Sequence, residues 1–219
     1  MISRIIAVMA IFLFVFSTTG YAQSNSLGVK ISTLGLGLEA ERSFSDSIGG
    51  RLGVNYLTYD YSGTEDDIEY DFELNLKSLS ALLDWHPFQG SFRISGGAVF
   101  HGNTIDANAK SAETFDIGNS TYTGAQVGTL TGKIDFENIA PYLGIGCDTS
   151  FGKDKSFGFL FELGAIYQGS PKVALSADGP IATNAAFQNE LAAEEKDLQS
   201  DLDAFKIYPV VAIGLSYRF

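Results

Sequence analysis

The chain has 219 residues and a formal net charge of −12 at pH 7. This acidic balance argues against nucleic-acid binding, because surfaces that bind nucleic acids are basic. The single cysteine, Cys147, cannot form an internal disulfide, and one cysteine with two histidines makes no convincing transition-metal site, so no cofactor is expected. The 24 glycines, 17 phenylalanines and 10 tyrosines favour strands and tight turns.

The first residues have the layout of a secretory signal peptide. Arg4 precedes the apolar run Ile5–Phe16, and small residues precede a cleavage site after Ala22. A membrane-anchoring helix, the other possibility, needs about 20 apolar residues, which is more than this run offers. We therefore predict a signal peptide over residues 1–22 and a single β-barrel domain over residues 23–219.

Alternating apolar and polar residues, typical of strands with one apolar face, fill much of the remaining chain. In one such segment the apolar positions change parity near Ser78, which predicts a bulge. A similar change near Pro141 predicts a bulge or an irregular pair. The clearly alternating segments are Leu34–Phe44, Ile48–Asp60, Phe72–Trp85, Phe92–Thr104, Ile134–Asp148, Phe157–Gln168 and Lys206–Phe219.

These segments number seven, and a closed antiparallel barrel of this kind has an even number of strands. The segment Leu27–Ile31 also alternates, and a tight hairpin near Thr33 would join it to the next strand. The alternative is that Lys172–Ala177 forms the extra strand, which would exchange the sides of the long and short connections. Eight strands with the first near Leu27 is the preferred arrangement.

The connections alternate between short and long. Short turns at one end and long loops at the other match the periplasmic turns and external loops of outer-membrane barrels. The three short turns are Ser45–Ser47, His86–Gly90 and Gly152–Ser156, and the long connections include an acidic loop around Glu65 and a polar loop over Ile105–Gly132.

The last long loop contains a segment with helical periodicity, Thr183–Phe205. Acidic residues surround an apolar stripe, so we expect an acidic amphipathic helix. Two roles are open for it: a lid over the barrel mouth, or a helix that buries its stripe against neighbouring loops. The stripe consists of Phe187, Leu191, Leu198, Leu202 and Phe205.

The final segment, Lys206–Phe219, carries aromatic residues near both ends and is long enough to cross a bilayer. An alternating strand closed by a terminal Phe219 resembles the C-terminal signature of bacterial outer-membrane β-barrel proteins, in which Tyr217 and Phe219 would be the assembly signal. With the signal peptide, the chain resembles the small outer-membrane β-barrel proteins of Gram-negative bacteria. The resemblance implies a closed antiparallel transmembrane barrel in the outer membrane. It also implies contact with membrane lipid and lipopolysaccharide, and assembly by the barrel-assembly machinery and periplasmic chaperones.

Alternation also predicts which side chains face the barrel interior. An eight-stranded barrel is just wide enough for side chains to fill, so its inward charges must pair. The predicted network either fixes the register as a structural salt-bridge system or forms a narrow polar path that opens when it rearranges. Its predicted members are Glu39, Glu41, Arg51, Glu73, Lys77, Arg93, Glu162, Lys206 and Arg218.

By the same alternation Leu163 faces lipid and Gly164 faces the interior, so Leu163→Arg is expected to cost far more stability than Gly164→Ser. Neither histidine sits in an ordered constellation with a nucleophile and an acid; His86 is expected to anchor the membrane interface and His101 lies on a strand face. We predict a non-enzymatic outer-membrane protein with a structural or surface-interaction role. The alternatives are a narrow pore or carrier for small or apolar solutes gated by the long loops, and a lipid-modifying enzyme.

Overall fold

The computed structural model describes residues 24–65, 68–111, 113–151 and 156–219. The predicted signal peptide, residues 1–22, lies outside the described residues. Among the described residues, no helix has the length and apolar character needed to span a membrane.

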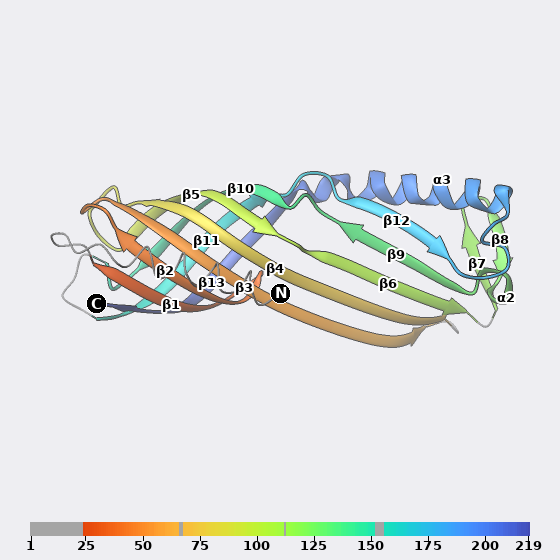
Figure 1. Ribbon diagram of the computed structural model, residues 1–219, viewed down its shortest axis with the longest axis horizontal. Coiled ribbons are helices and arrows are strands. Elements are labelled where there is room, and N and C mark those ends of the chain that lie inside the picture. Colours follow the sequence, from red (N-terminus) through yellow and green to blue (C-terminus); the bar gives the residue numbers. More distant parts are fainter. Residues whose placement is uncertain (1–23, 66–67, 112, 152–155) are drawn as a thin grey trace, which may run out of the picture.

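Eight antiparallel strands close into a barrel (Figure 1). Each strand pairs with the next in the order β1, β2, β3, β4, β5, β10, β11 and β13, and β13 pairs back onto β1. The closed barrel and its strand number confirm the predicted fold class, and the first strand lies near Leu27 as preferred. The strands are β1 (Asn25–Ser32), β2 (Gly35–Ser43), β3 (Ile48–Glu65), β4 (Ile68–Trp85), β5 (Phe92–His101), β10 (Ile139–Asp148), β11 (Phe157–Tyr167) and β13 (Ile207–Arg218).

The β1–β2 hairpin is tight and short. Gly35 has φ +99°, and a Cβ there would lie 2.6 Å from Cβ of Leu57, so only glycine fits this turn. The turn is tied sideways to β13, because Thr33 donates its N–H to Val211 O at 3.0 Å and its hydroxyl to Pro209 O at 2.9 Å. The hairpin therefore ends partway along the barrel wall, while β3 and β4 run on beyond it.

Strand β4 has no bulge, so that prediction was wrong. Its register with β3 passes Ser78, opposite Asn55, without a shift. Phe72 and Leu74 face the same side as the inward residues below them because they lie beyond the membrane, where lipid no longer selects apolar outward side chains. The change of parity in the sequence thus marks the edge of the bilayer.

Two predicted strands are each divided in the structure. The segment Ile134–Asp148 splits between β9 (Thr129–Asp135) and β10, and this break, not a bulge at Pro141, explains the change of parity. Phe92–Thr104 splits between β5 and β6 (Thr104–Ser111). At that junction Lys77 of β4 accepts a hydrogen bond from Gly102 N–H at 2.9 Å and donates its own N–H to Asn103 Oδ1 at 3.1 Å.

The polar segment predicted as a loop is folded. Strands β3 and β4 continue beyond the barrel, where β4 pairs with β6, β6 with β9 and β9 with β12 (Lys172–Ala177), and we call these five strands the extension sheet. Figure 1 shows it continuing along the long axis of the molecule. Lys172–Ala177 is therefore not a barrel strand. The remaining elements are β7 (Thr114–Ile117), β8 (Ser120–Thr123), α2 (Gly124–Val127), α3 (Ala185–Leu202) and η1 (Asp203–Lys206).

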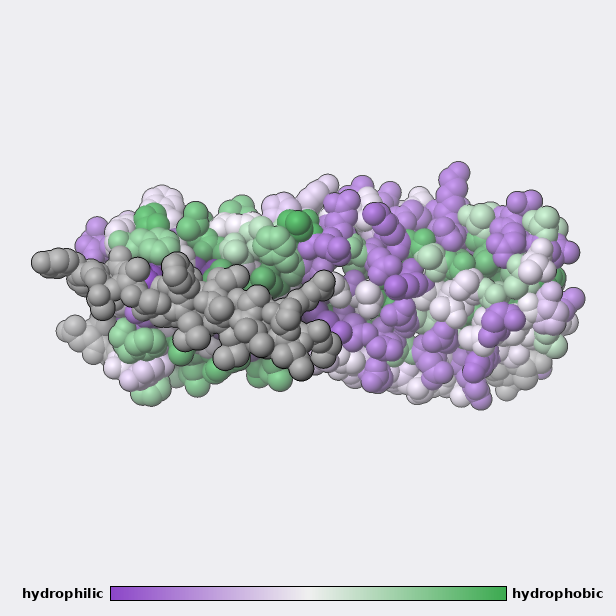
Figure 2. Space-filling view, viewed as in Figure 1, coloured by the Kyte–Doolittle hydropathy of each residue, from purple (hydrophilic) through white to green (hydrophobic). Residues whose placement is uncertain are grey.

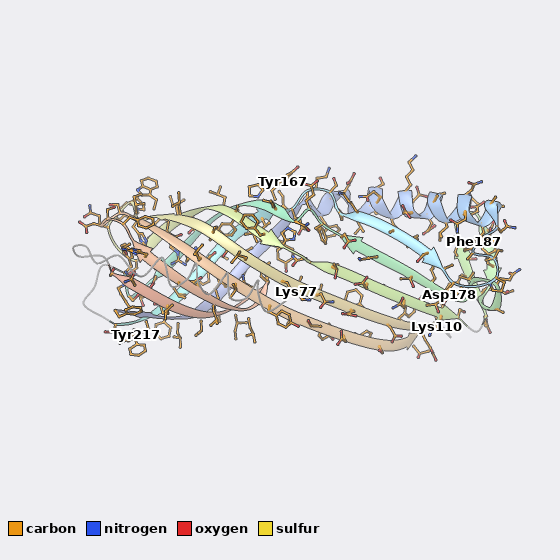
Figure 3. The ribbon with its side chains drawn as sticks, viewed as in Figure 1. Lys77, Lys110, Tyr167, Asp178, Phe187 and Tyr217 are labelled. Carbon is orange, nitrogen blue, oxygen red and sulfur yellow. The ribbon has the colours of Figure 1, made fainter. Side chains whose placement is uncertain are left out.

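Helix α3 lies along the extension sheet, not over the barrel mouth, so the lid role is not what the structure shows (Figure 1). Its first turn is capped by Asn184, whose side chain accepts the N–H of Ala186 at 2.9 Å. Phe187, labelled in Figure 3, is fully buried and meets Tyr122 edge-on at 5.0 Å. The core of the extension consists of Phe115, Ile117, Val127, Phe187 and Leu191.

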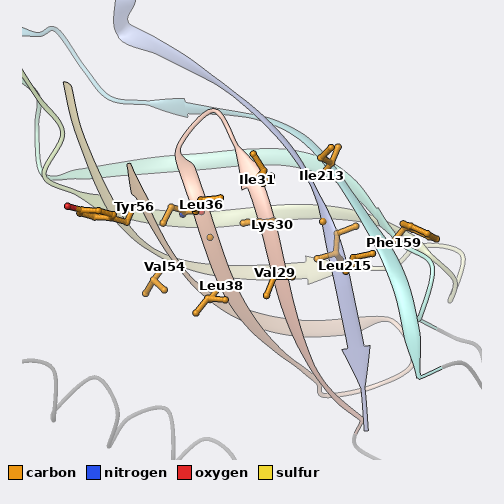
Figure 4. A pocket seen from close by; sticks show the side chains of 14 residues that line it. Val29, Lys30, Ile31, Leu36, Leu38, Val54, Tyr56, Phe159, Ile213 and Leu215 are labelled. Atoms are coloured by element: carbon orange, nitrogen blue, oxygen red, sulfur yellow. The ribbon is translucent and has the colours of Figure 1, made fainter. Parts of the chain in front are cut away.

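Apolar side chains cover the outer surface of the barrel. Figure 2 shows hydrophobic residues over the barrel and hydrophilic ones over the extension. In the close-up of Figure 4, Val29, Leu38 and Leu215 point away from the barrel axis. Tyr217 lies at the short-turn end and Tyr167 near the opposite rim (Figure 3). A closed barrel with such an apolar band and aromatic rims is suited to a lipid bilayer.

Candidate functional site

The centre of the barrel interior is organised around Arg51. Its guanidinium contacts three carboxylates: Nη1 lies 3.0 Å from Glu39 and 2.5 Å from Glu162, and Nε lies 2.9 Å from Asp84. Ser95 accepts a further hydrogen bond from Nη2 at 3.2 Å. The planar guanidinium group suits this position, because its several N–H donors can bind more than one carboxylate at once.

A second arginine and a lysine complete this level. Arg93 Nη2 lies 3.2 Å from Glu162 and its Nη1 lies 3.6 Å from Glu41. Lys30 Nζ lies 2.8 Å from Glu39. The two arginines and their carboxylates are buried and the Lys30 side chain is 8% exposed, so the attraction between them acts at low dielectric and the loss of one partner is costly.

Nearer the short-turn end the charges meet an aromatic stack. Arg218 Nη2 lies 3.8 Å from both Glu41 and Asp148, and its guanidinium sits 4.8 Å from the ring of Phe151. The ring of His86 is stacked on Phe151 at 3.5 Å, and its Nδ1 lies 2.9 Å from Gly90 O. His86 is fully buried, so it does not anchor the membrane interface as predicted, and burial lowers its pKa.

The structure brings together six of the nine predicted network residues: Glu39, Glu41, Arg51, Arg93, Glu162 and Arg218. The other three lie elsewhere. Glu73 and Lys77 point outward because β4 is unbroken and keeps its parity; Glu73 accepts from Asn75, and Lys77 Nζ lies 5.9 Å from the Tyr56 ring centroid. Lys206 ends η1, half-exposed and 4.0 Å from Asp203.

Sequence reasoning missed four titratable side chains of the interior network: Lys30, Asp84, Tyr142 and Asp148. The signal for the first three was present, since each stands between two residues that face lipid in the alternating pattern. Tyr142 donates a hydrogen bond to Glu162 and is 5% exposed. Counting both neighbours of every outward residue would have found these three.

The ring of Tyr142 needs the space left by two glycines. A Cβ at Gly164 would lie 2.6 Å from Cζ of Tyr142, and one at Gly144 would lie 2.8 Å from the same atom. Gly164 faces the interior, as predicted, but the space beside it is taken by Tyr142, so we expect Gly164→Ser to be destabilising as well.

The charged residues around Arg51 and Arg93 form an ionic layer inside the barrel, and an apolar layer adjoins it. Val99 is 1% exposed and Ala140 is 0% exposed, although both face the barrel axis. A water-filled channel at this level would leave such side chains accessible to solvent. The layer consists of Leu34, Leu82, Val99, Ala140, Tyr142, Ile166 and Val210, with Tyr208 packed against it. The two layers therefore consist of buried interior side chains that contact one another.

The catalytic candidates have no constellation around them in the described residues. His101 is buried opposite Ser78, and neither of its ring nitrogens has a hydrogen-bond partner. Nor do the described residues contain a cluster of three metal-binding side chains. Tyr217 and Phe219, the predicted assembly signal, both point outward at the short-turn rim, with ring centroids 6.1 Å apart.

Comparison with solved structures identifies the fold. Two crystal structures from Acinetobacter baumannii are similar: CarO2, with a TM-score of 0.62 and 21% identity over 90% of this chain and 98% of its own, and CarO, with a TM-score of 0.58 and 22% identity over 89% and 97%. Both are outer-membrane β-barrel proteins. This chain has the outer-membrane β-barrel fold. No protein-family model matches the sequence, and no curated protein matches it significantly. Proteins of the Gram-negative outer membrane share this closed barrel, its outward apolar band and its short turns at one end.

Proposed function

We propose that this protein is a non-enzymatic component of the outer membrane whose barrel is a closed anchor and whose extension sheet carries a surface-interaction role. The observation that carries the proposal is the ionic layer centred on Arg51, whose buried charges pair with one another inside the barrel beside the adjoining apolar layer. A barrel that is closed in this way stabilises and positions what stands above it.

The extension supports the surface role. It has its own core around Phe187 and stands beyond the apolar band, so it is exposed to the medium outside the cell when the short turns face the periplasm. Outer-membrane lipid and lipopolysaccharide surround the barrel in this proposal. The barrel-assembly machinery and periplasmic chaperones, acting on the end that holds Tyr217 and Phe219, deliver it.

Single-channel recording in planar bilayers tests the closed anchor against a narrow pore or carrier. The purified mature protein should give no stable, reproducible openings, with insertion verified by its resistance to protease in vesicles of the same lipid. Reproducible openings of uniform conductance would overturn the proposal, because they require a water path through both layers.

The lipid-modifying alternative is tested separately. Mass spectrometry of lipid A and phospholipids should give the same profile in cells that express the wild-type protein, cells that express His101→Ala and cells without the gene. A lipid species that depends on the wild-type protein and disappears with His101→Ala would show that the barrel is an enzyme.

A further inference from the structure

Strand β3 has a free edge beyond the barrel. Its last partner in β2 is Leu36, opposite Tyr56, yet β3 continues to Glu65, and within the part of the chain that the structure describes Leu57–Glu65 pairs only with β4. Figure 1 shows this stretch along the border of the extension sheet opposite to α3. Free strand edges present unpaired N–H and C=O groups that can accept another strand.

The other border of the same sheet is covered. Helix α3 satisfies the edge of β12: Gln199 accepts the N–H of Val173 at 3.2 Å, and Glu195 accepts the N–H of Leu175 at 3.1 Å. Gln199 also donates to Pro171 O. The fold therefore protects one edge with side chains and leaves the β3 edge open.

The backbone groups that face the open edge can be assigned. Lys77, opposite Tyr56, directs its N–H and C=O away from β3, toward Asn103 and Gly102. Because successive residues of an antiparallel ladder direct these groups to opposite sides, the even-numbered residues of β3 point theirs to the free edge. These residues are Thr58, Asp60, Ser62 and Thr64.

The side chains along this edge alternate in chemistry. Leu57, Tyr59 and Tyr61 share the face that continues into the barrel interior, and the two tyrosines are 54% and 56% exposed. Thr58, Asp60, Ser62 and Thr64 share the outer face. An incoming strand would therefore meet an aromatic face on one side and a polar face on the other.

The polar face lacks a positive charge on the edge side. Four charged residues lie in a row across neighbouring strands of the extension sheet. The row runs from Lys133 through Asp106 and Glu73 to Asp60, so its member at the free edge is a carboxylate. Between Arg51 and Lys77 the sequence has seven acidic residues and no basic one. Like charges directly opposite one another are destabilising, and a cation beside Asp60 would relieve the row.

We propose that the free edge of β3 binds an extended polypeptide segment with alternating basic and apolar residues, which adds to the extension sheet as one more strand. The basic side chains lie beside Asp60, and the apolar ones lie on Tyr59 and Tyr61. A second copy of this chain is a poor occupant, because its own β3 edge carries the same acidic face. This inference rests on the proposed surface-interaction role and names its partner chemistry.

The test uses the full mature protein in lipid nanodiscs and a capped nine-residue peptide of alternating lysine and valine, with binding measured by fluorescence anisotropy. A glutamate–valine peptide should not bind. The lysine–valine peptide with N-methyl groups at alternate residues keeps its charge but cannot form the ladder, so it should bind about tenfold more weakly. Equal binding of the methylated and unmethylated lysine peptides, or no binding of either, overturns the proposal.

Two variants test the site on the protein. Ser62→Pro removes an N–H that faces the free edge without taking one from the ladder with β4, so the protein should fold and bind about tenfold more weakly. Asp60→Asn should weaken binding several-fold and reduce its salt dependence. Asp197→Asn removes the same charge from an exposed position of α3 and should change nothing. If Asp197→Asn weakens binding as much as Asp60→Asn, the attraction is general and the edge site is refuted.

The two proposals can fail independently. An absence of peptide binding together with an absence of conductance would remove only the edge site. Stable conductance would remove the closed anchor whatever the peptide does.

Discussion

The strongest test of the membrane placement is an arginine at Leu163, near the middle of β11. Its side chain faces lipid, 41% exposed, between Ile145 and Val211 on the adjacent strands. It lies six residues from Phe157 and four from Tyr167. At about 3.3 Å per residue and a tilt of about 40°, these are roughly 15 Å and 10 Å along the membrane normal. Their sum matches an apolar band of about 25 Å.

Leu163→Arg should therefore lower the free energy of unfolding by about 2–4 kcal/mol, the cost of arginine near the midplane. Ile207→Arg is the matched control. Ile207 also faces lipid but pairs with Tyr167 at the rim, so its cost should be about 0–1 kcal/mol.

The assay is equilibrium unfolding in urea from lipid vesicles, followed by the fluorescence of Trp85, the single tryptophan, which points outward at the short-turn rim. A cost for Leu163→Arg no greater than that for Ile207→Arg would show that the bilayer is not where the apolar band places it.

Three further changes probe the interior. Arg51→Met should cost about 3–5 kcal/mol in the same titration, because three buried carboxylates lose their partner, and adding Glu162→Gln should recover part of this; an unchanged or larger loss in the double variant contradicts the network. Gly164→Ser should destabilise by about 1–3 kcal/mol through overpacking against Tyr142, and a neutral effect would mean that the ring has room. Burial lowers the pKa of His86 below its ordinary value of 6.5, so the unfolded chain binds the proton first and stability falls as the pH drops below about 6.5. His86→Gln should reduce the loss of thermal stability between pH 7 and pH 5, and an identical slope in both proteins would refute this assignment.

The barrel could be predicted because lipid imposes one strict rule: every second residue of a membrane-spanning strand must be apolar. In Phe157–Tyr167 that rule gives an unbroken row of outward apolar side chains, and the structure places them on the barrel exterior. Beyond the membrane the rule lapses. Ile105, Ala107 and Ala109 alternate too, but the pattern is short and weakly apolar, and their partners in β4 lie 31 to 39 residues away in the sequence.

The interior network shows the same limit. Arg51 and Glu162 could be predicted to face the interior because their neighbours in the alternating pattern face lipid. Glu73 and Lys77 were misplaced because an assumed bulge reversed their facing, and a single residue of register error moves every side chain to the other face. Asp84 contacts arginines on both neighbouring strands, Arg51 on β3 and Arg93 on β5, and alternation could indicate only the facing of Asp84, not which charges it meets.

Strand β4 has a mechanical consequence. The same 18 residues pair with β5 inside the membrane and with β6 outside it, and β3 accompanies them throughout. No hinge or linker separates the two parts along this hairpin, so a pull on the outer sheet loads the β3–β4 ladder lengthwise and reaches the bilayer directly. The extension sheet is consequently stiffly joined to the barrel and is not a separate domain. A truncation that removed it would also shorten two of the barrel strands, β3 and β4.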